Sequence, residues 1–281
     1  MIMNTMTQQI SSYQAILAQR ILAVGLGVLL FASMLSLWND LPQLYGTDAL
    51  FPDDLLYLQQ DFTIGTQLQL FSASMGGVKS LSFLYLSLCV LLCFRVGGRY
   101  TAALLLLLHL SFFRSLILFT YGFDQLATIA LFYCILLPFK GSLHLLRIHL
   151  CLIYCFAGLD KMLGITWWNG EALYKAITLP YGYRQLLPIL QWLAQWPLLY
   201  KIGGIAVWLS EIMYPLFFLL RDRRYALWYA VLLHLSIACI MQLYLFSGVM
   251  LLLNFAAWPP RKLYFMFYPA RFAFHKLIFQ K

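Results

Sequence analysis

The residues best suited to chemistry in this chain are ionisable side chains that stand inside long apolar runs. Away from water such a group costs on the order of 3 kcal/mol unless it is paired or hydrated, so each is a candidate for proton transfer, charge pairing or substrate binding. The candidates are Arg20, His109, Arg114, Asp124, His149, Asp160, Lys161, Glu211 and His234.

Structural roles remain open for most of these candidates. Arg114 and Asp124 could form an ion pair that fastens a tight turn, and Lys161 could extend its ammonium group to the membrane surface. Glu211 could hydrogen-bond to a neighbouring helix or to His234 and have no further role. No metal-ligand spacing, glycine-rich phosphate loop or Gly-x-Ser-x-Gly elbow occurs, so the residues alone name no reaction.

Some polar and sulfur-bearing residues have a simpler interpretation. We expect His109 and His149, which are single histidines in apolar runs, to be satisfied packing residues. Arg20 is expected to anchor the first helix at the cytoplasmic surface. The six cysteines also stand in apolar runs, and we interpret them as small apolar side chains rather than as a disulfide or metal site.

The elements that position these residues are predicted to be membrane-spanning helices. The chain has 281 residues, of which 63% are hydrophobic and only 10% are charged, whereas soluble domains are about 45–50% apolar and about 25% charged. The sequence therefore predicts an all-α, polytopic transmembrane helical bundle with about eight spans. The expected spans are residues 16–38, 79–97, 100–120, 124–139, 143–163, 202–220, 225–243 and 244–258.

Basic residues set the expected orientation. They cluster in segments that alternate with loops poorer in lysine and arginine, and the positive-inside rule places the basic segments in the cytoplasm. We therefore expect a plasma-membrane protein with both termini cytoplasmic and no cleavable signal peptide. The expected domains are a cytoplasmic N-terminus (1–15), a transmembrane domain (16–260) and a basic amphipathic tail (261–281).

Two long loops are expected to carry interfacial helices on the outer face. The loop at 39–78 is acidic and contains no lysine or arginine, and the loop at 164–201 is rich in tryptophan and proline. Tryptophan gathers at membrane–water boundaries because its ring is apolar and its N–H needs a partner. The net charge of +9 matches basic cytoplasmic loops, so the expected partner is the lipid bilayer and not nucleic acid.

This orientation gives each candidate a depth in the membrane. Glu211 and His234 fall near the middle of their spans, and the candidates nearer the outer surface are Arg114, Asp124, Asp160 and Lys161. We therefore expect a polar cluster that opens to the outer face.

The fifth expected span carries the most specific pattern in the chain. It reads Tyr154-Cys-Phe-Ala-Gly-Leu-Asp-Lys161, followed by Trp167-Trp-Asn-Gly170. This stretch resembles the signature of the horizontally transferred transmembrane (HTTM) family, in which Tyr-Phe-x-Ala-Gly-x-x-Lys precedes Trp-x-x-Gly. Weaker similarity extends over about residues 16–260 and includes Tyr121-Gly-Phe-Asp124, as well as Glu211 and His234 in their spans.

The resemblance implies a chemistry for Lys161. The family includes the membrane part of vitamin K-dependent gamma-carboxylase, in which a lysine at this position acts as a base toward a bound hydroquinone. A lysine must be neutral to accept a proton, and desolvation in a membrane favours the neutral form. Asp160 stands where the carboxylase has a second lysine, and Asp124 stands near the place of a histidine, so glutamate carboxylation is not expected.

Three hypotheses follow. The preferred one is an HTTM-type enzyme that acts on a lipid-soluble quinol or a secreted peptide, with Lys161, Glu211 and His234 as catalytic residues. The second is a non-catalytic membrane partner for the maturation or immunity of an exported peptide, as in the sporulation-delaying-protein B group of the family. The third is a proton-coupled transporter. In the preferred hypothesis a quinone or hydroquinone is the cofactor, and the substrate pocket is formed by Arg114, Asp124, Asp160, Tyr154 and Trp167.

Overall fold

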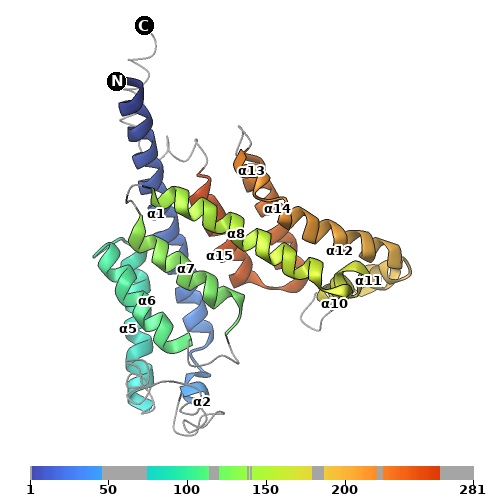
Figure 1. The fold of residues 1–281 in the computed structure, drawn as a ribbon. Coiled ribbons are helices and arrows are strands. Elements are labelled where there is room, and N and C mark those ends of the chain that lie inside the picture. Colours follow the sequence, from blue (N-terminus) through green and yellow to red (C-terminus); the bar gives the residue numbers. More distant parts are fainter. Residues whose placement is uncertain are drawn as a thin grey trace. The chain divides into compact units, whose positions relative to one another are not determined.

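The structure is a computed structural model, and the regular structure of the residues that it describes is helical, without a strand (Figure 1). It describes residues 2–45, 75–113, 120–137, 139, 141–178, 187–219 and 224–259. The predicted all-α fold class is therefore confirmed for these residues. Arg114, most of the 39–78 loop and the expected amphipathic tail lie outside the described residues.

The chain divides into two compact units, residues 18–139 and residues 140–281 together with 1–17. We call them the 18–139 unit and the 140–281 unit. In its described residues, the 18–139 unit contains the larger part of helix α1 and four further helices. Their bounds are α1 Ile2–Ser36, α2 Leu41–Tyr45, α5 Met75–Cys93, α6 Arg99–Phe113 and α7 Gly122–Leu136.

A buried histidine joins three helices of the 18–139 unit. His109 on α6 is 1% exposed, and its Nε2 lies 3.1 Å from the backbone oxygen of Asp124 on α7. Because a carbonyl oxygen only accepts, Nε2–H donates to it, and Nδ1 is left to accept from the hydroxyl of Tyr85 on α5 at 2.9 Å. His109 is thus a packing residue with both ring nitrogens bonded, as the sequence predicted.

Within the described residues, the long helices of the 140–281 unit form two packed pairs. Helix α8 packs against α12, α14 packs against α15, and α15 also contacts α8. Short helices between α8 and α12 contact the start of α12. The bounds are α8 Ser142–Leu163, α9 Ile165–Trp168, α10 Glu171–Thr178, α11 Leu187–Ala194, α12 Pro197–Ile212, α13 Leu216–Leu219, α14 Arg224–Met241 and α15 Tyr244–Ala257.

Glycine at position 158 allows α8 and α12 to approach closely. A Cβ atom on Gly158 would lie 2.7 Å from the backbone oxygen of Trp208 and 2.8 Å from the side chain of Ile212. Real Cβ atoms do not come this close to backbone, so only glycine fits here without a shift of the helices. This contact brings the last turn of α8 against the last turn of α12.

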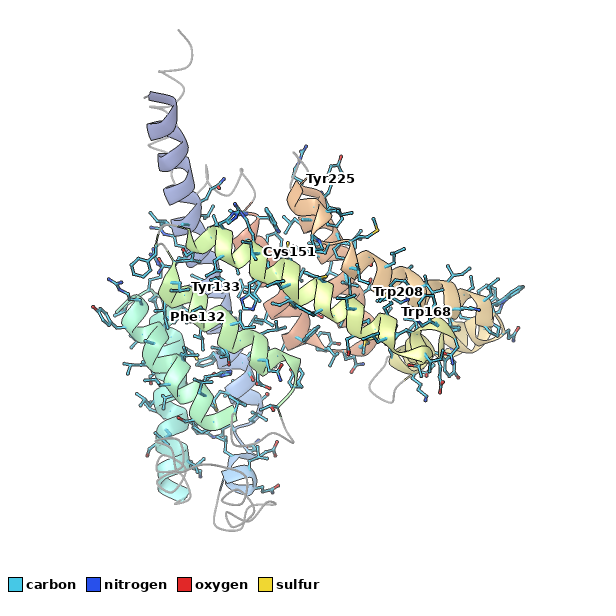
Figure 2. All side chains as sticks on the ribbon, viewed as in Figure 1. Phe132, Tyr133, Cys151, Trp168, Trp208 and Tyr225 are labelled. Atoms are coloured by element: carbon cyan, nitrogen blue, oxygen red, sulfur yellow. The ribbon has the colours of Figure 1, made fainter. Side chains whose placement is uncertain are left out.

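Large apolar side chains cover much of the outer surface of both units (Figure 2). On α7, for example, Phe132 is 45% exposed whereas its neighbour Tyr133 is 1% exposed. On α14, Trp228 and Leu232 are 65% and 67% exposed. Exposed apolar side chains on several helices are typical of helices that face lipid.

Three described helical segments are long and apolar enough to cross a membrane, judged by length and composition alone: Gln14–Ser36, Ser142–Leu163 and Arg224–Met241. Four shorter apolar helices coincide with other expected spans, namely Gly77–Cys93, Arg99–Phe113, Gly122–Leu136 and Tyr244–Ala257. A membrane protein is therefore supported.

The expected span at 202–220 is wrong as one continuous helix. Helix α12 ends at Ile212, and a turn containing Pro215 precedes α13. Proline has no N–H, and its ring clashes with the carbonyl of the residue four positions earlier, which here is Glu211. The helix therefore ends at Ile212, about two turns before the expected end at residue 220.

Candidate functional site

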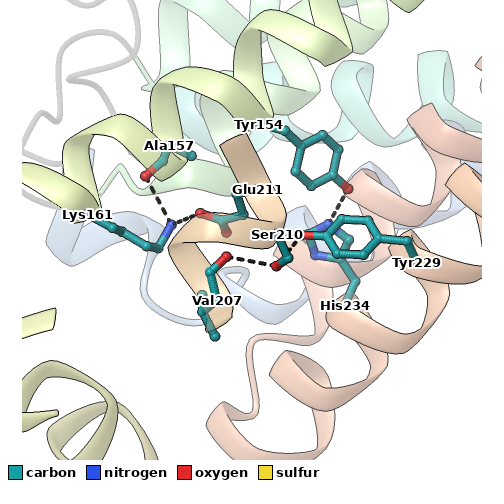
Figure 3. Close-up of polar contacts among 8 residues, drawn as sticks. All are labelled: Tyr154, Ala157, Lys161, Val207, Ser210, Glu211, Tyr229 and His234. Atoms are coloured by element: carbon teal, nitrogen blue, oxygen red, sulfur yellow. Dashed lines mark hydrogen bonds and ion pairs between the residues drawn. The ribbon is translucent and has the colours of Figure 1, made fainter. Parts of the chain in front are cut away.

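An ion pair between α8 and α12 forms the centre of the candidate site. Nζ of Lys161 lies 2.6 Å from Oε2 of Glu211, and the two side chains are 23% and 7% exposed (Figure 3). Lys161 follows Gly158 by three residues, so both lie on the α8 face that meets α12. The glycine contact thereby sets the separation of the amine and the carboxylate.

The ammonium group of Lys161 has two further contacts. Its Nζ lies 3.4 Å from the backbone oxygen of Ala157 and 5.5 Å from the ring centroid of Trp167. The backbone oxygen accepts a hydrogen bond, and the negative face of the indole attracts the cation. The backbone oxygen of Ala157 and the ring of Trp167 thus add two partners for the amine to the carboxylate of Glu211.

A tyrosine and a histidine form a second polar contact on the same helix face. Tyr154 lies seven residues before Lys161, which is about two helical turns. Its hydroxyl lies 2.7 Å from Nε2 of His234 on α14 (Figure 3). The two residues are 2% exposed each, so helix α8 holds both the ion pair and a buried tyrosine–histidine pair.

A chain of hydrogen bonds extends from Tyr154 into the core. Asn254 on α15 donates from Nδ2 to the Tyr154 hydroxyl at 3.0 Å and to the backbone oxygen of Met250 at 2.8 Å. Its Oδ1 accepts from the Tyr214 hydroxyl at 2.7 Å, and that hydroxyl accepts from Nε1 of Trp258 at 3.0 Å. Every donor direction in this chain is fixed, because the indole only donates and both amide protons are committed.

Aromatic rings pack around this chain. The rings of Tyr154 and Tyr214 stack with centroids 4.0 Å apart, and Tyr229 lies about edge-on to Tyr154 with centroids 6.0 Å apart. The Tyr229 hydroxyl lies 3.1 Å from Oγ of Ser210, the residue before Glu211 (Figure 3). The polar groups therefore sit in an aromatic environment in which bulk water does not compete for them.

Five of the eight predicted site residues lie within the 140–281 unit around this centre. They are Lys161, Glu211, His234, Tyr154 and Trp167. Lys161 and Glu211 are in direct contact, whereas His234 contacts Tyr154 instead of the ion pair. Asp160 belongs to the same helix but is exposed, because adjacent helix residues point in different directions.

Asp124 lies in the 18–139 unit and has a local role there. Its Oδ2 accepts a hydrogen bond of 3.0 Å from the backbone N–H of Tyr121 at the start of α7. A carboxylate in the first turn of a helix also interacts favourably with the helix dipole. Its predicted partner Arg114 lies outside the described residues, so the predicted ion pair stays a prediction.

Sequence reasoning missed Asn254, Tyr214 and Trp258. Asn254 stands inside an apolar run, so the rule that selected ionisable residues would have found it if amides had been included. Tyr214 and Trp258 gave no comparable signal, because the chain contains 18 tyrosines and 8 tryptophans, many of them in apolar runs.

The arrangement can move a proton within the ion pair and can hold a polar group near His234. Amine and carboxylate are at hydrogen-bond distance, which is the geometry that proton transfer requires.

Compared with known proteins, the chain matches no protein-family model, no curated protein and no solved structure.

Proposed function

We propose that this chain is an HTTM-like integral membrane protein that removes a proton from a lipid-soluble quinol or a secreted peptide at the outer face, with Lys161 as the base. The observation that carries the proposal is the 2.6 Å contact between Lys161 and Glu211, held between two helices and largely shielded from water. The motif around Tyr154 and Lys161 supports the same assignment.

The proposal includes a topology of eight spans in the plasma membrane with both termini cytoplasmic. Three long apolar helices and four shorter ones support seven of these spans. Helix α12 with the turn at Pro215 and α13 forms the remaining one, as a broken span. Broken helices at membrane depth occur where the freed backbone is covered by protein, and they often lie next to functional groups.

The proposed step begins inside the ion pair. Lys161 passes one proton from Nζ to Oε2 of Glu211, which leaves a neutral amine beside a neutral carboxylic acid. This transfer removes two opposite charges from a site poor in water, so the neutral pair is far closer in free energy to the ion pair than it would be in water. Glu211 thus holds the proton that would otherwise keep the amine from acting as a base.

The neutral amine then accepts the acidic proton of the substrate. The electron pair of the broken bond stays on the substrate as an anion, and the new ammonium group at Lys161 balances its charge. Trp167 stabilises that ammonium through its ring, 5.5 Å from Nζ. Tyr154 and His234 shape the site on the other side of Glu211 (Figure 3).

The test uses the full chain in lipid nanodiscs and two variants of the base. Lys161→Ala removes the amine, and Lys161→Arg keeps a cation that does not deprotonate in proteins. Menadiol is titrated without oxygen, and its anion is followed by absorbance. The wild type is expected to generate bound anion at a pH where menadiol in solution is neutral, and both variants are expected to lose this.

Lys175→Ala is the matched control. Lys175 belongs to the same unit and pairs with Glu171 at 2.6 Å, but its side chain is 66% exposed. This variant is expected to match the wild type. Equal anion formation by the wild type and by Lys161→Ala would contradict the proposal. In a separate experiment, mass spectrometry of lipids and peptides retained after gentle detergent extraction would identify the natural ligand.

A further inference from the structure

One ring nitrogen of His234 has no partner within the part of the chain that the structure describes. Nε2 is bonded to Tyr154, but Nδ1 is buried without a hydrogen bond, and the whole residue is 2% exposed. Buried polar groups in proteins nearly always have a partner, because leaving one unsatisfied is costly. His234 thus presents a polar atom that the described residues leave unsatisfied.

The hydrogen-bond chain determines which nitrogen carries the proton. Asn254 donates to the Tyr154 oxygen, so the Tyr154 O–H is free to donate to Nε2 of His234. Nε2 then accepts, and the ring proton is on Nδ1. With the proton on Nε2 instead, Tyr154 would accept from both neighbours, and its own O–H would lose its acceptor. The hydrogen bonds from Asn254 to Tyr154 and from Tyr154 to His234 therefore make Nδ1–H of His234 a donor.

A second unpartnered group lies on the helix that packs against α14. Ser247 on α15 is 1% exposed, and its hydroxyl has no hydrogen-bond partner among the described residues. It directly follows Phe246, whose ring packs edge-on against His234 with centroids 6.0 Å apart. Helices α14 and α15, which pack together, thus each contribute one buried polar group that is unsatisfied among the described residues.

We propose that His234 Nδ1–H binds the carbonyl oxygen of an apolar ligand between α14 and α15. An N–H donor among aromatic rings selects a ligand with an apolar body and an acceptor oxygen. The inference rests on the proposed function in one respect, since the same ligand would reach Lys161. Asn254 and Tyr214 are positioning residues, because they set the His234 tautomer through Tyr154.

The tautomer is tested directly by ¹⁵N NMR of protein labelled at histidine. His234 is expected to show Nδ1–H, whereas His109 is the internal reference with Nε2–H. Assignment follows from His234→Phe and His109→Phe. Asn254→Leu removes the donor to Tyr154 and is expected to bring the Nε2–H form of His234 into the spectrum. A wild-type spectrum with the proton on Nε2 would overturn the inference.

Binding is tested with menadione, which has carbonyl oxygens on an apolar ring, and with 2-methylnaphthalene, which lacks them. Quenching of tryptophan fluorescence in nanodiscs measures both affinities. The wild type is expected to prefer menadione by about tenfold, the value of one hydrogen bond. The preference is expected to disappear in His234→Phe and His234→Gln and to survive in His234→Asn, whose amide replaces Nδ1. An unchanged preference in His234→Phe would refute the subsite.

A lipid ester could supply the same carbonyl, so dioctanoylglycerol is compared in a parallel titration. Competition between dioctanoylglycerol and menadione would identify a lipid ester as a second source of the carbonyl oxygen. If the two do not compete, the quinone is the source. Failure of the subsite is distinguishable from failure of the proposed base. Loss of anion formation in Lys161→Ala with an unaltered menadione preference in His234→Phe supports the base alone, and the reverse pattern supports the subsite alone.

Discussion

Pro215 stands four residues after Glu211 and removes the backbone donor that would otherwise bind the Glu211 carbonyl oxygen. That oxygen accepts instead from the N–H of Tyr214 at 3.1 Å, and α12 ends. Glu211 therefore lies in the last turn of its helix, where the dipole is negative and a cation is favoured. The ammonium of Lys161 is placed where both the carboxylate and the helix end attract it.

A double-mutant cycle on Lys161 and Glu211 tests whether the pair is energetically coupled. Glu211→Gln leaves the ammonium without its counter-charge and is expected to cost about 3 kcal/mol in unfolding free energy. The double variant Lys161→Met with Glu211→Gln is expected to cost less than the sum of the single variants. The same cycle on the exposed pair Lys175 and Glu171 is expected to show no measurable coupling. Additive effects at Lys161 and Glu211 would show that the contact contributes nothing.

Gly158→Ala tests the close approach of α8 and α12. The added Cβ would meet the backbone of α12, so the helices must separate, at an expected cost of about 2 kcal/mol. Gly203→Ala is a matched control, because its Cβ would meet only the mobile end of the Leu173 side chain, at 2.6 Å. Thermal unfolding in nanodiscs should separate the two variants, and equal melting temperatures would mean that the helix contact tolerates a methyl group.

Asn254→Leu tests the buried hydrogen-bond chain. The substitution leaves the hydroxyls of Tyr154 and Tyr214 without their amide partner, with an expected loss of about 1–3 kcal/mol in unfolding free energy. Tyr225→Phe removes a hydroxyl from a residue that is 59% exposed and should leave stability unchanged. The two variants are compared by thermal unfolding. A stable Asn254→Leu protein would show that the chain is dispensable for folding.

Arg147 is predicted to stabilise the end of α15. It is 9% exposed, and its Nε donates to the backbone oxygen of Ala257 at 2.9 Å while its guanidinium lies 4.9 Å from the ring of Trp258. Arg147→Met keeps the volume but leaves a helix-terminal carbonyl unsatisfied, at an expected cost of about 2 kcal/mol. Arg147→Lys keeps the charge and is expected to retain part of the stability. Chemical denaturation measures the unfolding free energy of both variants. Equal unfolding free energies for Arg147→Met and Arg147→Lys would rule out a specific guanidinium contact.

The proposed topology is tested by labelling single cysteines in a variant without the six native ones. Lys175→Cys is expected to react with an impermeant thiol reagent added outside intact cells. Arg99→Cys is expected to react only after the membrane is opened. Labelling of both from the same side would contradict the proposed orientation.

The charged part of the candidate site could be predicted from sequence because a charge in an apolar run is rare and costly. Lys161 and Glu211 were selected on that ground, and the structure places them in contact. The partner of His234 could not be chosen in the same way, since tyrosine is common in apolar runs. Sequence position also cannot show that Tyr154, 80 residues away, lies within hydrogen-bond reach.

The helical class was predictable for the same reason, but helix ends were not. Composition requires helices because lipid offers the backbone no hydrogen bonds. The end of α12 depends on a single proline inside an apolar pattern that otherwise continues, and the burial of Arg147 against Trp258 is equally invisible in the apolar pattern. A hydropathy pattern averages over many residues, so it registers neither the effect of one proline on a helix nor an individual tertiary contact.

Tyr154, Gly158 and Lys161 follow one another along a single stripe of α8, at spacings of four and three residues. Helix α8 therefore carries both the amine of the ion pair and the tyrosine that hydrogen-bonds to His234. A rotation of α8 about its own axis would separate Lys161 from Glu211 and Tyr154 from His234 in the same motion. The proposed proton transfer and the proposed ligand binding would then both depend on one motion of helix α8.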